Sequence, residues 1–182
     1  MQFEESTVKK GERYYRKGKV LWVVKSGGKL FSKVLGTYPY YVEIDLETGK
    51  NICTCPLGGN CKHVAATVTA YEKGAYFEAF SKSVEVFPEA TALEFLNEVP
   101  ELALDVTLKE LRFYLNTDES GSEVARLFLR ALKLVERSGR EEALHILEEV
   151  LEEYRHVFPD YELITKLEEE LMAIKAPFQK AL

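Results

Sequence analysis

The sequence predicts an α+β protein in two parts: a small antiparallel β-meander with flanking helices, followed by an all-α helical domain. Short β-branched and aromatic runs separated by glycine turns occupy residues 20–53, which is typical of consecutive strands. Apolar residues recur at helical spacing over residues 122–171. The charge also differs between the two parts. Residues 1–74 hold 12 lysines and arginines against 7 acidic residues, whereas residues 75–182 hold 12 against 23. We therefore place one domain at residues 1–80 and a second, acidic domain at residues 81–182.

The N-terminal domain is expected to alternate helix, strands and helix. Its predicted elements are a helix at 5–17, strands at 20–24, 30–35 and 40–46, a short strand reaching residue 53, and a helix at 61–73. Glycine turns separate the first two strands, and Gly74 provides a C-terminal stop for the second helix. Trp22 and Tyr40 are expected in the core. They could instead stack on nucleic-acid bases together with Tyr38 and Tyr41.

The C-terminal domain is expected to contain helices opened by polar caps. A linker runs from residue 75 to residue 88. Predicted helices then follow at 91–99, 107–115, 122–137, 140–158 and 161–176. Threonines are expected to cap the first two, Ser122 the third and Asp160 the last, because their side chains can accept hydrogen bonds from free helical amides. Ser138-Gly139 and the prolines at 159 and 177 are expected to end helices. His145 and His156 have no metal-binding neighbours at suitable spacing and are expected on the surface.

All three cysteines and one of the three histidines lie in one short stretch, Cys53-Thr54-Cys55 followed by Cys61-Lys62-His63. Two cysteines separated by one residue in an extended chain place both sulfurs on the same side. The loop between the pairs contains two glycines, and Cys61 and His63 stand where the next helix begins. Three thiolates and one imidazole form a complete tetrahedral ligand set for zinc. We therefore expect Cys53, Cys55, Cys61 and His63 to bind a structural zinc ion.

Two other uses of these residues explain the pattern less well. A disulfide would pair two of three cysteines, and Cys53 lies too close to Cys55 to pair with it comfortably. A Cys–His nucleophile would leave two thiols at ligand spacing without a role.

The motif Cys53-x-Cys55-x5-Cys61-x-His63 resembles the SWIM zinc finger, whose pattern is C-x-C, a variable gap and C-x-H. The flanking residues 41–45 and 61–66 agree with this resemblance, and residues 11–20 are similar to the segment that leads into the domain in prokaryotic members. The resemblance covers residues 1–80, and its five-residue gap is short for the family. It implies zinc as the cofactor. SWIM modules occur in chromatin-type ATPases and recombination factors and are thought to bind DNA or proteins.

The sequence contains no enzyme signature, such as a P-loop, a dinucleotide-binding glycine turn or a Ser/His/Asp set, so we expect a non-enzymatic protein. Binding of single- or double-stranded DNA is the first hypothesis, with phosphate contacts from Lys9, Lys10, Arg13, Arg16, Lys17 and Lys62. The same basic helix could instead be a solvated surface. The alternative function is a protein-interaction adaptor, for example a partner of a recombination or chromatin-type ATPase. The helical domain is expected to bind a protein under either hypothesis.

The sequence also predicts the compartment. No apolar stretch is long enough to span a membrane, and the N-terminus is acidic. We expect a cytoplasmic protein that does not bind membranes.

Overall fold

The structure is a computed structural model that describes residues 3–79, 99–158 and 160–179. The chain forms two compact units, Met1–Val99 and Pro100–Leu182. The predicted boundary at residues 80 and 81 and the predicted helix at 91–99 fall almost wholly outside the described residues, so both stay predictions. Within the described ranges, no helix combines the length and apolar character needed to cross a bilayer.

The first unit is built on a five-stranded sheet with the strand order β4-β3-β2-β1-β5. Its strands are β1 (Val20–Ser26), β2 (Lys29–Leu35), β3 (Pro39–Asp45), β4 (Asn51–Cys53) and β5 (Phe77–Ala79). The first four pair antiparallel in chain order, which confirms the predicted meander. Strand β5 was not predicted. It pairs parallel to β1, with Phe77 opposite Val24, at the start of the predicted linker. A three-residue strand is too short to show an alternating pattern in the sequence.

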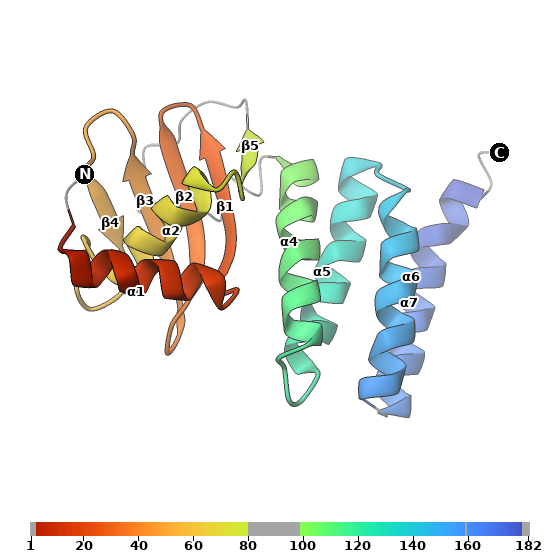
Figure 1. Cartoon of the computed structure of the whole chain (residues 1–182). Helices are drawn as coiled ribbons and strands as arrows, with labels where there is room; N and C mark the ends of the chain where they lie inside the picture. Colours follow the sequence, from red (N-terminus) through yellow and green to blue (C-terminus); the bar gives the residue numbers. More distant parts are fainter. Residues whose placement is uncertain (1–2, 80–98, 159, 180–182) are drawn as a thin grey trace. The chain divides into compact units, whose positions relative to one another are not determined.

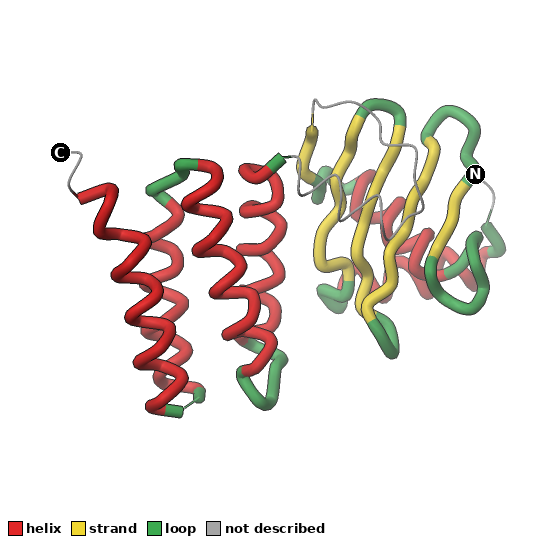
Figure 2. Tube along the Cα trace, turned by 180° about the vertical axis from the view of Figure 1, so that it is seen from behind, coloured by secondary structure: helices red, strands yellow, loops and turns green. Residues whose placement is uncertain are grey.

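Two helices cover one face of this sheet, as Figures 1 and 2 show from opposite sides: α1 (Glu5–Arg16) and α2 (Lys62–Glu72). The helices cross in close contact at Gly11. A Cβ atom added there would lie 2.6 Å from Cβ of Ala65 and 2.7 Å from its carbonyl carbon. The core between helices and sheet is formed by alternating strand residues and the inner side of α2; it includes Val23, Leu30, Val34, Val42, Ile44, Val64 and Ala70. Trp22 is 2% exposed, which confirms its predicted burial.

The second unit consists, in its described part, of helices that run alternately up and down (Figure 1). They are α4 (Pro100–Leu115), α5 (Ser122–Ser138), α6 (Ala143–Val157) and α7 (Tyr161–Gln179). The predicted inward residues of α6 are buried: Leu144, Leu147, Leu151, Tyr154 and, just after the helix, Phe158. The predicted cap of α7 is also confirmed, because the amide of Leu163 donates to Oδ1 of Asp160 at 3.1 Å.

Three helix boundaries differ from the prediction. Helix α6 begins at Ala143 instead of residue 140, because residues 140–142 form a turn in which the amide of Ala143 donates to the Arg140 carbonyl at 3.1 Å. Helix α4 begins at Pro100 instead of Thr107, since proline at the first helical position loses no intrahelical hydrogen bond. Thr107 lies buried inside this helix, and its hydroxyl donates to the Ala103 carbonyl at 2.6 Å. Helix α7 continues through Pro177 and ends two residues later. A proline this close to the C-terminal end of a helix disturbs only the hydrogen bonds of its last turn.

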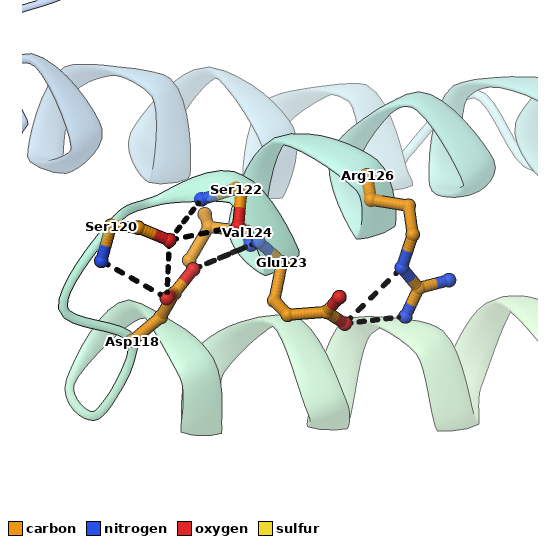
Figure 3. A network of polar contacts seen from close by, with 6 residues as sticks. All are labelled: Asp118, Ser120, Ser122, Glu123, Val124 and Arg126. Atoms are coloured by element: carbon orange, nitrogen blue, oxygen red, sulfur yellow. Dashed lines mark hydrogen bonds and ion pairs between the residues drawn. The ribbon is translucent and has the colours of Figure 1, made fainter.

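The prediction that Ser122 caps α5 is wrong, because Asp118 in the preceding loop does so (Figure 3). Oδ2 of Asp118 accepts from the amides of Glu123 at 2.8 Å and Val124 at 3.4 Å. Ser122 is already helical, and its hydroxyl lies 2.8 Å from that of Ser120. The residue before it, Gly121, has φ of 74° and offers no side chain. Desolvation opposes ionisation of Asp118, but the backbone amides outweigh it and lower the pKa of its carboxyl.

We predict that Asp118→Ala destabilises the second unit by about 1 kcal/mol at pH 7, the usual cost of a lost N-cap. Because the pKa of Asp118 is lower in the folded state than its ordinary value of about 3.9, the stabilisation is present above that value and is lost as the pH falls through the folded-state pKa. The difference between the two proteins should therefore shrink in acid. Urea unfolding followed by helical circular dichroism measures it. Ser122→Ala is the matched control and should change stability little; the opposite ranking would restore Ser122 as the cap.

Candidate metal centre

The three cysteines and His63 converge where β4, the following loop and the start of α2 meet. Their ligand atoms all lie within 4.8 Å of one another, and all four residues are buried. Strand β4 supplies Cys53, and the chain continues to Cys55. Cys61 is the residue before α2, and His63 lies in its first turn. Residues that are ten positions apart in the chain thus form one compact cluster.

The loop between the two pairs is closed by its own backbone. The amide of Cys53 donates to the Gly58 carbonyl at 2.8 Å, and the amide of Gly58 donates to the Cys55 carbonyl at 2.9 Å. Gly58 has φ of 72°, a left-handed conformation that favours glycine. Asn51 also fixes the loop, because its Oδ1 accepts from the amide of Asn60 at 2.7 Å. The short gap between the cysteine pairs therefore still permits a well-bonded turn.

The donor atoms fit a zinc ion. Nδ1 of His63 lies 3.7 Å from the sulfur of Cys53 and 3.7 Å from the sulfur of Cys61, so Nδ1 is the nitrogen that faces the thiols. Hydrogen bonding between the two side chains lowers the pKa of Cys61 and raises that of Cys53, while burial raises both pKa values. A metal cation between the sulfurs allows both of them to be thiolates. Three thiolates and a neutral imidazole are a closed, structural ligand set.

The imidazole of His63 is positioned by aromatic rings. Tyr40 stacks on it with ring centroids 4.7 Å apart, and Tyr14 of α1 meets it edge-on at 5.5 Å. Nε2 is buried and has no hydrogen-bond partner among the described residues. Zinc-bound histidines usually donate this second nitrogen to a carboxylate or carbonyl. Ring packing holds the imidazole here. Tyr40, which was predicted in the core, is half-buried beside the metal ligand.

The predicted phosphate-binding residues occupy different surroundings. Lys10, Arg13, Arg16 and Lys17 are exposed on or just after α1, and Lys9 is exposed but paired with Glu5 at 2.6 Å. Lys62 is half-buried, with its Nζ 4.9 Å from the centre of the Tyr14 ring. Lys19 was not among the predicted residues, and its Nζ lies over the same ring at 5.5 Å. Its only sequence signal is its position directly after the basic helix.

His145 and His156 are exposed on α6, as predicted. They lie in the second unit, and they are not part of the cluster of metal-binding side chains found among the described residues.

Comparison with known proteins agrees with the geometry of the cluster. The SWIM zinc finger family model matches residues 42–72, which include all four clustered residues. A protein of Methanocaldococcus jannaschii, named only as uncharacterized, is 32% identical over 102 residues. That match covers 54% of this chain and 44% of the archaeal protein, so the chain matches less than half of its relative's length. No solved structure matches. The chain carries a SWIM zinc finger, and its cofactor is zinc.

We predict one zinc ion per chain and loss of that zinc in Cys55→Ser. Apparent binding free energies of structural zinc sites are about 10–16 kcal/mol, so the first unit should unfold preferentially in this variant. Elemental analysis and thermal melting measure both effects. Thr54→Ala changes the residue between two ligands and should keep the metal. Full zinc content and unchanged melting in Cys55→Ser would contradict the ligand assignment.

A second prediction concerns Gly36, which lies behind the imidazole. A Cβ atom at this position would lie 2.6 Å from the Tyr40 ring and 3.0 Å from Nε2 of His63. Gly36→Ala should therefore displace the ring and weaken zinc binding by about 10- to 100-fold, as other changes around metal ligands do. Competition with a chromophoric chelator measures this affinity. Gly28→Ala is the matched control, because nothing lies within 4 Å of its added Cβ. Equal zinc affinities in both variants would show that ring packing does not position the ligand.

Proposed function

We propose that this protein is a non-enzymatic, cytoplasmic nucleic-acid-binding protein whose zinc finger supports a basic surface, and that DNA is its ligand. The observation that carries the proposal is the arrangement around Tyr14. This ring contacts the zinc ligand His63 on one side and lies under the amino groups of Lys19 and Lys62. Exposed basic residues of α1 continue from it. The position of the zinc ligand His63 and the positions of Lys19 and Lys62 therefore depend on the same ring, Tyr14.

The charge distribution supports a phosphate ligand in spite of the net charge of −6. All of the excess acidic charge belongs to residues 75–182, whereas residues 1–74 are basic. At physiological salt, screening over about 8 Å limits the repulsion that distant carboxylates exert on a phosphate. The resulting affinity is weak and largely independent of base sequence, because phosphate contacts carry no sequence information.

A protein-interaction adaptor is the second candidate, and a specific observation favours it. Three apolar side chains in or beside β4 and the β2–β3 connection are unusually exposed: Tyr38 at 69%, Ile52 at 48% and Leu57 at 76%. Exposed apolar groups of this kind are common at protein interfaces. In this second proposal the zinc finger and the acidic helices of the second unit both engage proteins, for example a recombination or chromatin-type ATPase.

The test is fluorescence anisotropy of labelled DNA and RNA with the zinc-loaded full chain over a series of salt concentrations. If about four cations contact phosphates, the slope of log K against log salt should be about −4 on duplex DNA and about −3 on a single strand. Absence of binding to every DNA and RNA probe, even at low salt, would contradict nucleic-acid binding and leave the adaptor as the surviving candidate.

A further inference from the structure

The two sides of α1 differ in charge. Tyr14 faces the zinc site, and its neighbours on the helix surface, at positions −4 and +3, are Lys10 and Lys17. Arg13 lies between these two, three residues after one and four before the other. With Lys19 and Lys62 over the Tyr14 ring, this side forms the metal-side flank, which we define as Lys10, Arg13, Lys17, Lys19 and Lys62. The flank contains no acidic residue.

The opposite side of α1 has mixed charge. It borders a groove of about 630 Å³ between α1 and α2, to which Glu12, Arg16, Glu72 and Lys73 all contribute. Lys9, one turn after Glu5, forms an ion pair with it. We call Glu5, Lys9, Glu12 and Arg16 the groove-side flank. Its two cations are accompanied by two carboxylates, so it attracts a phosphate chain less than the metal-side flank does.

One exposed aromatic residue lies in a connection that begins beside the metal-side flank. The amide of Leu35 donates to the Lys19 carbonyl at 2.7 Å, so the connection between β2 and β3 starts beside Lys19. That connection contains Tyr38, which is 69% exposed. Figure 1 shows the same connection and the C-terminal end of α1 at one end of the sheet. The other three rings that could stack on bases are engaged elsewhere: Trp22 is buried, Tyr40 stacks on His63, and Tyr41 packs beside Trp22 at 6.5 Å.

We infer that the metal-side flank binds a single-stranded nucleic acid, with the phosphates along α1 and one base stacked on Tyr38. This inference rests on the proposed function and specifies the surface and the form of the ligand. A row of cations beside an exposed aromatic ring is the arrangement that single strands need, because their bases are free to stack on a side chain. In a duplex the faces of the bases are covered by their neighbours, so Tyr38 would contribute little.

The test uses the full-length, zinc-loaded chain and two matched double variants, each lacking two positive charges of α1. Arg13→Ala/Lys17→Ala changes the metal-side flank, and Lys9→Ala/Arg16→Ala changes the groove-side flank. Anisotropy with one oligonucleotide, as a single strand and as a duplex, is measured over a salt series. On the single strand, the first variant should reduce the magnitude of the salt slope by about 1.4, from two lost contacts at about 0.7 each, and the second should leave it nearly unchanged.

Tyr38→Ala should weaken single-strand binding by about 5- to 100-fold and duplex binding much less, while Tyr38→Phe should keep most of the affinity. Zinc content, measured in every variant, confirms that the fold is retained. Equal loss in the two double variants, preference for the duplex, or no effect of Tyr38→Ala would overturn this inference while nucleic-acid binding stands. Absence of binding by the unmodified chain would overturn both.

Discussion

The first unit depends on one constraint, the convergence of three sulfurs and one imidazole on a single zinc ion. The four residues come from the end of β4, the loop after it and the start of α2, so the metal joins the edge of the sheet to the helix that covers it. Strand β4 is only three residues long and pairs with one neighbour. A strand this short gains little from its own hydrogen bonds, and we expect the zinc site to stabilise its position.

The consequences extend from the metal to α1. Because Gly11 lets α1 approach the backbone of α2 directly, Tyr14 reaches the imidazole of His63 and brings Lys19 and Lys62 to the same ring. Lys19 and Lys62 are therefore held over Tyr14, a ring that itself packs against His63. In the proposed function, this coupling is how a closed zinc site contributes to binding: it arranges the surface beside it.

Much of this arrangement could be predicted from the sequence, since its signals are local. The alternation of Val42 and Ile44 marked β3, and the spacing of the cysteines and His63 marked the zinc site. What failed depended on residues outside the element itself. Strand β5 exists only through its pairing with β1, and Asp118 caps α5 from four residues before the helix begins. The part played by Tyr14 and Lys19 depends on the crossing of two helices, which no local pattern records.

If zinc holds the first unit together, Trp22 should report the loss of the metal. It is the only tryptophan in the chain and is 2% exposed in the sheet of this unit, so its emission reports on the first unit alone. We predict that removing zinc with a chelator shifts Trp22 emission to longer wavelength, while the helical circular dichroism of the second unit largely persists and added zinc reverses the shift. Complete removal of zinc with no change in Trp22 emission would show that zinc does not hold the first unit together.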